Sequence, residues 1–208
     1  MKLTVFGATG GTGRLFVQRA LAEGHLVTAV VRRPEAMTDS HPALDVLKGD
    51  VMARDTLEVH AGCEAVVFLA GAVKGGPHDV YTRGVPNVMA AMRESGVSRL
   101  VVVTNGMRSG PADTAIQRIV KILLRNTLLR HVYRDHVRLH ELIAGDPLDW
   151  TIVRPPRLLD GPARGGYRTA VGDTIPNGFS ITRADLAEAV LRVAPDRATV
   201  RRTVDVSF

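Results

Sequence analysis

Residues 2–13 read KLTVFGATGGTG, in which a short apolar run is followed at once by glycines at positions 7, 10 and 13. Apolar residues then recur at helical spacing from Leu15 to Leu21, and Gly24 is expected to end this helix in a left-handed cap. A glycine turn between a strand and a helix is typical of a phosphate site, because free N–H groups at the start of the helix point at the turn. The residues predicted to hold the diphosphate of a dinucleotide are Gly7, Thr9, Gly10, Gly11, Thr12 and Gly13.

Short apolar runs and helical patterns alternate along the rest of the chain. This alternation implies right-handed crossovers and a mainly parallel sheet with helices on both faces. We therefore predict a single-domain α/β fold of the Rossmann type, doubly wound, with about seven strands. The predicted strands are 2–6, 26–31, 44–48, 65–70, 100–103, 150–153 and 203–206, and the main predicted helices are 12–23, 80–94 and 181–193.

One segment interrupts the alternation of strands and helices. Residues 113–144 carry two further helical patterns between the fifth and the sixth strand. Insertions that follow the carboxyl end of a strand build substrate pockets in open α/β sheets. Within the one domain, residues 1–208, we therefore predict a substrate-side helical insertion at about 106–145 and a lid portion at about 157–180.

The composition limits the class of protein. The 208 residues are 45% hydrophobic, and 23% are charged, as in an ordinary globular domain. The single Cys63 cannot form an internal disulfide, and the chain begins with a strand pattern instead of a secretion signal, so we expect a cytoplasmic protein without stable membrane insertion. The net charge of +6 suggests an anionic partner. With 4% aromatic residues and no recognition motif, nucleic acid is not the expected partner.

The end of the second predicted strand bears on the choice of nucleotide. A carboxylate there accepts from the ribose hydroxyl of NAD, whereas arginine accommodates the 2′-phosphate of NADP. The chain has Arg32 and Arg33 at this point and no acidic residue before Glu35, which favours NADP over a merely solvated basic loop. Asp50 and Val51 follow the third strand, where they are placed to contact the adenine, although Asp50 is equally suited to cap a helix near Thr56.

These motifs occur in an order that resembles a known family. The chain is similar to the atypical short-chain dehydrogenases/reductases, the NAD(P)H-binding, NmrA-like group, and within it to the biliverdin-IXβ reductase/flavin reductase family. The resemblance implies an NADP-type cofactor across the strand ends, a shallow pocket for a planar tetrapyrrole or flavin, and hydride transfer from the nicotinamide. The motifs that carry it are GATGGTG (7–13), VVRRP (30–34), KGDV (48–51), FLAG (68–71), DHVRLH (135–140), RPP (154–156) and Gly166-Tyr167.

The resemblance also indicates the nicotinamide side of the site, with two departures from the family pattern. Asn105 stands where the family has a serine after the fifth strand, and Arg157 stands where it has a histidine after the proline pair. Asn105 can still donate and accept hydrogen bonds, and Arg157 adds a fixed positive charge. The residues expected to line this side are Ala70, Gly71, Thr104, Asn105, Pro155 and Pro156.

The reaction type is constrained by the proton donors. Short-chain dehydrogenases that reduce simple ketones pair a Tyr with a Lys four residues later, and none of Tyr81, Tyr133 and Tyr167 has such a Lys. A delocalised electrophile needs less help, because solvent can protonate it later. His136 and His140 lack the further ligands of a zinc site, so no metal is expected. The candidate catalytic residues are Asn105, Tyr133, His136 and Arg157.

We therefore expect an NADPH-dependent reductase that transfers hydride to a planar conjugated acceptor such as a flavin, a quinone or a tetrapyrrole-like molecule. Two alternatives remain open: a non-catalytic NAD(P)-binding redox sensor of the NmrA-like type, and an epimerase or dehydratase on the same scaffold. The sequence leaves monomer and homodimer equally open. The insertion is basic and suited either to steer an anionic substrate or to form a solvated face, and membrane-surface contact through 116–131 is a lesser alternative. Its basic residues are Arg118, Lys121, Arg125, Arg130, Arg134 and Arg138.

Overall fold

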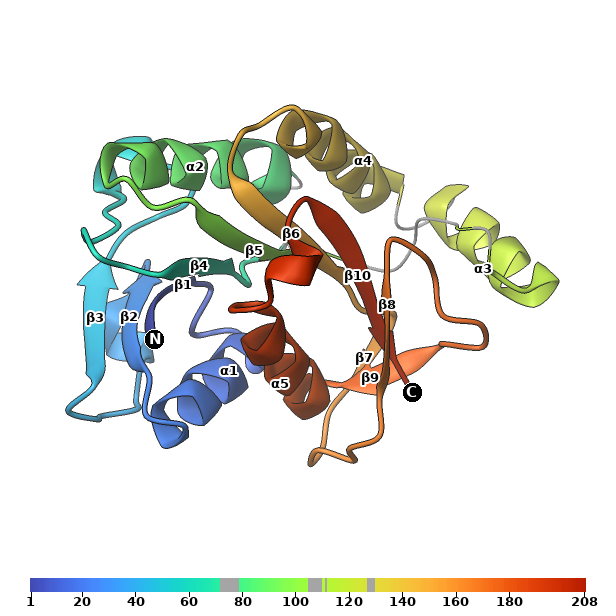
Figure 1. Ribbon diagram of the computed structural model, residues 1–208, viewed down its shortest axis with the longest axis horizontal. Helices are drawn as coiled ribbons and strands as arrows, with labels where there is room; N and C mark the ends of the chain where they lie inside the picture. Colours follow the sequence, from blue (N-terminus) through green and yellow to red (C-terminus); the bar gives the residue numbers. More distant parts are fainter. Residues whose placement is uncertain (72–78, 105–109, 111, 127–129) are drawn as a thin grey trace.

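An eight-stranded sheet runs through the centre of the protein in the order β3-β2-β1-β4-β5-β6-β10-β8 (Figure 1). The computed structural model describes residues 1–71, 79–104, 110, 112–126 and 130–208. Neighbouring strands are parallel, except that β8 runs antiparallel to β10. The strands are β1 (Lys2–Phe6), β2 (Leu26–Val31), β3 (Leu44–Lys48), β4 (Ala65–Phe68), β5 (Arg99–Val103), β6 (Asp149–Arg154), β8 (Arg168–Val171) and β10 (Arg202–Ser207).

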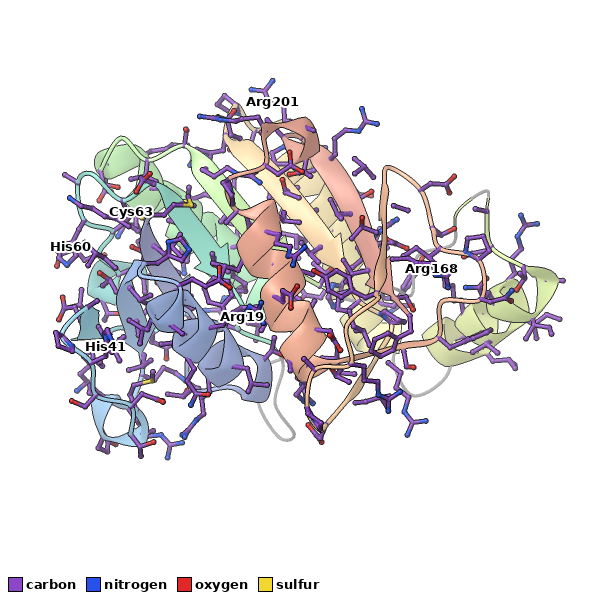
Figure 2. All side chains as sticks on the ribbon, turned by 60° about the horizontal axis from the view of Figure 1, so that its bottom comes forward. Arg19, His41, His60, Cys63, Arg168 and Arg201 are labelled. Carbon is purple, nitrogen blue, oxygen red and sulfur yellow. The ribbon has the colours of Figure 1, made fainter. Side chains whose placement is uncertain are left out.

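Helices cover both faces of this sheet. On one face α1 (Gly11–Ala22) and α5 (Arg183–Val193) pack side by side, and an ion pair between Arg19 Nη1 and Glu188 Oε2, 3.0 Å apart, links them (Figures 1 and 2). On the other face lie α2 (Val85–Glu94) and α4 (Arg130–Ala144). Each face buries its own apolar core, because the central strands are covered on both sides. Short helical turns are η1 (Pro34–Ala36), η2 (Arg54–Thr56), η3 (Val80–Gly84, a π-helix) and η4 (Arg197–Thr199).

The predicted doubly wound α/β fold is confirmed, and all of the strands expected from the sequence are present. The sheet has one more strand, β8, and a separate parallel pair is formed by β7 (Arg157–Leu159) and β9 (Ser180–Thr182). These three lie in the region predicted as a lid. β7 and β8 were missed because they are three and four residues long and mostly exposed, so neither shows an apolar run. β9 is largely buried, but its residues 181–182 were wrongly assigned to the start of the next helix, which begins at Arg183.

The order of the strands places a crevice at the end of the sheet where the parallel strands have their carboxyl termini. From β1 the chain builds β2 and β3 on one side and then returns to build β4, β5 and β6 on the other. The connections that follow β1 and β4 therefore lead in opposite directions from neighbouring strand ends, and ligands of open α/β sheets bind in the crevice between such connections. The fourth strand ends at Phe68, two residues earlier than expected, so Ala70 and Gly71 belong to the loop at this edge.

The helical insertion consists of α3 (Ala115–Asn126) and α4, as expected, and α3 lies at the periphery of the molecule (Figure 1). α3 docks through its polar side: Gln117 is 3% exposed, and its Nε2 donates to the carbonyl of Ile175 at 3.0 Å. Lys121 Nζ bonds both carboxylate oxygens of buried Asp113, at 2.8 and 3.0 Å. The apolar side chains Ile116, Ile119, Val120, Ile122 and Leu123 are 40 to 66% exposed. No helix within the described ranges is long and apolar enough to cross a membrane.

Candidate functional site

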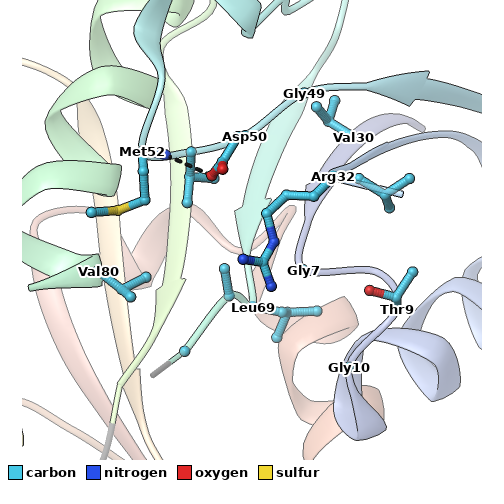
Figure 3. Close-up of a pocket in the computed structure, with 14 residues that line it drawn as sticks. Gly7, Thr9, Gly10, Val30, Arg32, Gly49, Asp50, Met52, Leu69 and Val80 are labelled. Carbon is cyan, nitrogen blue, oxygen red and sulfur yellow. Dashed lines mark hydrogen bonds between the residues drawn. The ribbon is translucent and has the colours of Figure 1, made fainter. Parts of the chain in front are cut away.

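A groove opens at the carboxyl ends of β1, β2, β3 and β4 (Figure 3). It contains eight of the residues that the sequence assigned to cofactor binding. Those eight are Gly7, Thr9, Gly10, Arg32, Asp50, Val51, Ala70 and Gly71. Six more residues complete its wall, namely Val30, Val31, Gly49, Met52, Leu69 and Val80. The sequence missed Val80 because it reaches the groove from η3, a later turn of the chain.

At two positions of the loop after β1, any residue larger than glycine would clash with backbone atoms. Gly7 has a φ of +87°, and a Cβ there would lie 2.4 Å from the backbone nitrogen of Ala70. A Cβ on Gly13 would lie 2.1 Å from the carbonyl oxygen of Gly7. The loop therefore packs directly against the end of β4 and against the first turn of α1. Gly7 thus permits the tight turn, and Gly13 permits the close contact between helix and loop.

The first turn of α1 is free to hold an anion. Gly10 is the N-cap and provides no side-chain hydrogen bond, and no acidic residue lies in the first turn. The N–H groups of Gly11, Thr12 and Gly13 have no partner within the helix, since the first N–H groups of any α-helix lack one. The helix dipole adds a partial positive charge at the same place. This turn has the donors that a diphosphate requires.

Arg14 is a site residue that the sequence analysis overlooked. Its Nε donates to the carbonyl of Thr9 at 3.2 Å, and one Nη donates to the carbonyl of Ala36 at 2.7 Å. The side chain thus ties the phosphate loop to the segment that follows β2. Its position directly after the last glycine of the motif was the only available signal, because its partners are backbone atoms distant in sequence.

The two arginines after β2 differ in position. Arg32 lines the groove, and Figure 3 shows its side chain extending into it from the end of β2. Arg33 is exposed and is not among the groove residues. Asp50 also lines the groove and forms a local turn, in which its carboxylate accepts from the N–H of Met52 at 3.0 Å. Thr56 does not receive a cap from this carboxylate; its hydroxyl accepts from the N–H of Asp50 at 2.9 Å.

On the expected nicotinamide side, the side chain of Thr104 carries an unsatisfied polar atom. Thr104 follows β5 and is 9% exposed, and its Oγ1 has no hydrogen-bond partner in the described part of the chain. A buried hydroxyl without a partner is costly unless a ligand or water satisfies it. Pro155 is buried after β6, and Pro156 lines a small separate cavity beside Gln117. Asn105 lies outside the described residues.

A buried aromatic pair adjoins this end of the groove. Tyr81, the residue after Val80, packs against His136 with ring centroids 4.3 Å apart and ring planes tilted by 41°. A Cβ on Gly71 would lie 3.5 Å from the Tyr81 hydroxyl. The carboxylate of Asp135 accepts from the N–H groups of Tyr81 and Thr82, both at 2.9 Å, which fixes η3 against α4. The sequence could not pair these residues, since 54 positions separate Tyr81 from Asp135.

Burial sets the protonation of this pair. His136 is 6% exposed, and burial lowers the pKa of its imidazole to about 4. Burial also raises the pKa of the Tyr81 phenol, with a further contribution from the charge of Asp135. At neutral pH the pair is therefore a neutral imidazole packed against a neutral phenol. From the sequence, His136 could equally have been a residue of a partly exposed helix face, but α4 turns it into the core, where it is 6% exposed.

The other catalytic candidates lie elsewhere. Tyr133 is half-buried on α4, and Arg157 is exposed at the start of β7; neither is among the groove residues. Cys63 precedes β4, at the opposite end of that strand from the groove (Figure 2). Within the described segments no three His, Cys, Asp or Glu side chains are grouped as metal ligands would be.

Comparisons with known proteins agree with this geometry. Residues 7–197 match the family model described as NAD(P)H-binding. An uncharacterized chloroplastic protein of Arabidopsis thaliana is 29% identical over 99% of this chain and 76% of its own length. A UPF0659 protein of Schizosaccharomyces pombe is 29% identical over 99% of this chain and 90% of its own length.

Solved structures share the fold. A short-chain dehydrogenase/reductase of Veillonella parvula, solved in complex with NADP, has a TM-score of 0.80 at 17% identity over 100% of this chain and 94% of its own. An anaerobilin reductase of Escherichia coli O157:H7 has a TM-score of 0.74 at 23% identity over 100% and 97%. The resemblance noted from the sequence is confirmed at the level of the family. The chain belongs to the NAD(P)H-binding family.

Proposed function

We propose that this protein is an NADPH-dependent reductase that transfers hydride to a planar conjugated acceptor such as a flavin, a quinone or a tetrapyrrole. The observation that carries the proposal is the combination in one groove of an uncapped helix N-terminus and Arg32. The first suits a diphosphate, and the second suits the 2′-phosphate that distinguishes NADP from NAD. Arg32 occupies the place where NAD-binding proteins of this fold carry a carboxylate.

The described residues of the groove can be assigned to the parts of a dinucleotide in turn. The loop from Gly7 to Gly13 would hold the diphosphate, and Val51 would contact the adenine beside Arg32. The unsatisfied hydroxyl of Thr104 would meet the nicotinamide amide, beyond Gly71. When bound, the reduced nicotinamide supplies the hydride, and the protein supplies its orientation.

The acceptor class follows from the lack of a ready acid. In the described part of the site the nearest phenol and imidazole, Tyr81 and His136, both hold neutral forms at pH 7, and burial makes Tyr81 a weaker acid than free tyrosine. A simple ketone would need an acid to protonate the developing alkoxide. A conjugated acceptor spreads the added charge and can take its proton from water. The insertion that carries α3 follows the carboxyl end of β5, where open α/β sheets build substrate pockets, and its exposed apolar side chains include Ile119 and Leu123. The structural likeness to an anaerobilin reductase supports the same class.

The test is a turnover assay with a panel of acceptors. Each reaction contains purified protein, NADPH and one acceptor. The acceptors are FMN, a short-chain quinone, biliverdin and a simple aliphatic ketone. Loss of the nicotinamide absorbance is then followed against a control without protein. We expect turnover with at least one conjugated acceptor and none with the ketone. Tight NADPH binding without turnover on any acceptor would contradict the reductase and favour a redox sensor. Turnover on the ketone alone would contradict the acceptor class.

A further inference from the structure

The helices α1 and α5 begin next to one another. A Cβ built on Gly11, the first residue of α1, would lie 3.2 Å from Cδ and 3.3 Å from Nε of Arg183, the first residue of α5. Because Gly11 has no side chain, the stem of Arg183 occupies the space over the first turn of α1. The two helices run in the same direction, since Arg19 and Glu188 pair further along both. The positive end of α1 and a guanidinium therefore meet beside the phosphate loop, whereas α5 carries the carboxylate of Asp185 in its own first turn.

The fold itself gains little from Arg183 at this place. A cation in the first turn of a helix is opposed by the helix dipole, and the first turn of α1 holds no acidic residue to offset this. The N-terminus of α5 is already capped by Thr182, whose hydroxyl accepts from the N–H of Asp185 at 3.0 Å. The carboxylate partner of Arg183 is Asp160, 2.8 Å from Nε, but the Asp160 side chain is 90% exposed. Such exposed ion pairs are weak and are readily exchanged.

We propose that Arg183 is a ligand of the cofactor diphosphate, and that it leaves Asp160 to bind it. The inference rests on the proposed function and adds a residue from the far end of the chain to the phosphate loop. A phosphate oxygen seated on the N–H groups of Gly11 and Thr12 lies within reach of the guanidinium, whose planar fork suits phosphate. Asp160 holds Arg183 in position when the groove contains no phosphate and competes with the cofactor for it.

Binding of four ligands distinguishes a contact of Arg183 with the diphosphate from a contact of Arg32 with the 2′-phosphate. NADPH, NADH and ADP-ribose all carry the diphosphate, whereas adenosine 2′-monophosphate carries only the adenine end and the 2′-phosphate. The dissociation constant of each is measured by calorimetric titration for the wild type, Arg183→Gln and Asp160→Asn. We expect Arg183→Gln to weaken the first three ligands roughly tenfold and to leave the monophosphate unchanged. We expect Asp160→Asn to tighten the same three roughly twofold, because it removes the competitor.

The matched control is Arg192→Gln, which removes an arginine from the same helix. The Arg192 side chain is 72% exposed and pairs with Glu188, so this variant should bind all four ligands as the wild type does. The melting temperature of Arg183→Gln should stay at or above that of the wild type, since the dipole of α1 opposes the charge.

Equal binding of the diphosphate ligands by Arg183→Gln and the wild type would overturn the inference. Equal weakening of the monophosphate would also overturn it, because the effect would then not be local to the diphosphate. Failure of Asp160→Asn to tighten binding would overturn the exchange with Asp160. If the wild type bound none of the four ligands, the proposed function itself would fall, which is a different result from any of these.

Discussion

The groove at the carboxyl ends of β1 and β2 and the insertion between β5 and β6 use their side chains in opposite ways. The groove is shaped by backbone: Gly7 and Gly13 are in contact with main-chain atoms, and the anion site consists of N–H groups. In the insertion, α3 buries Gln117 and Lys121 against the body and exposes Ile119 and Leu123. Amphipathic helices usually do the reverse. In the described part of the chain, backbone therefore shapes the groove, whereas α3 is held by polar side chains and leaves its apolar side exposed.

Gly13→Ala is expected to have the largest effect on both stability and NADPH binding. The added methyl group would lie 2.1 Å from the carbonyl oxygen of Gly7, so either α1 or the phosphate loop must move. We expect the free energy of unfolding to fall by roughly 3 kcal/mol. We expect NADPH binding to weaken at least tenfold, since the N–H groups of the first turn would be displaced. Urea denaturation and a calorimetric titration measure the two effects.

Gly145→Ala is the matched control for this substitution, because a Cβ there meets nothing within 4 Å. It should change neither stability nor binding appreciably. If Gly13→Ala behaved like Gly145→Ala, the close packing of loop on helix would be wrong, and with it the claim that backbone contacts shape the groove.

The next largest effect is the pH dependence of stability that His136 causes. This residue of α4 packs against Tyr81, where the insertion meets the groove. Its pKa is about 4 in the folded protein and close to 6.5 in the unfolded chain, so below pH 6.5 the unfolded state takes up a proton that the folded state does not. The stability that depends on this group is complete above pH 6.5 and is lost as the pH falls towards 4. Between pH 7.5 and 5 the expected loss is about 2 kcal/mol.

His136→Phe keeps an aromatic ring against Tyr81 and removes the titrating group. The free energy of unfolding of this variant should therefore depend less on pH between 7.5 and 5 than that of the wild type, by the same amount. Parallel pH profiles for the two proteins would mean that His136 is not buried as described.

The smallest effect on stability is expected on the outer face of α3. Ile119 is 59% exposed, so Ile119→Ser should change the free energy of unfolding by less than about 0.5 kcal/mol. If this face receives a planar acceptor, the KM for that acceptor should rise several-fold while NADPH binding stays unchanged. Leu142→Ser, at a 50% exposed leucine of α4, is the control and should alter neither quantity. A large loss of stability in Ile119→Ser would show that the face is packed, and an unchanged KM would remove it from the acceptor site.

The same contrast explains what could be predicted from the sequence. The groove was predictable because its function depends on the absence of side chains at Gly7, Gly10 and Gly13 and on one short strand–turn–helix segment. Contacts that join distant parts of the chain were not: Val80 reaches the groove through η3, Arg14 meets Ala36, and Arg183 lies over Gly11. The apolar spacing of α3 predicted a helix but not which side of it would face the body, because periodicity gives no direction.

On the expected nicotinamide side, the sequence predicted the positions of residues but not their chemical state. Thr104 was placed correctly at the end of β5, yet its unsatisfied hydroxyl could be recognised only from its burial. His136 was named from its spacing to His140, but its neutral state follows from packing against Tyr81. The spacing of residues in the sequence indicates which side chains share a helix face. Only tertiary contacts determine their protonation state and which groups they can contact.

The most direct test of the central claim is a titration of the wild type and of Arg32→Asp with both reduced cofactors. Arg32 lines the groove, and a carboxylate in its place would repel a 2′-phosphate and accept from a ribose hydroxyl. We predict that the wild type binds NADPH more tightly than NADH, and that Arg32→Asp loses at least tenfold in NADPH affinity while NADH binding is kept or improved. Tighter binding of NADH by the wild type, or an unchanged NADPH affinity in Arg32→Asp, would contradict the account.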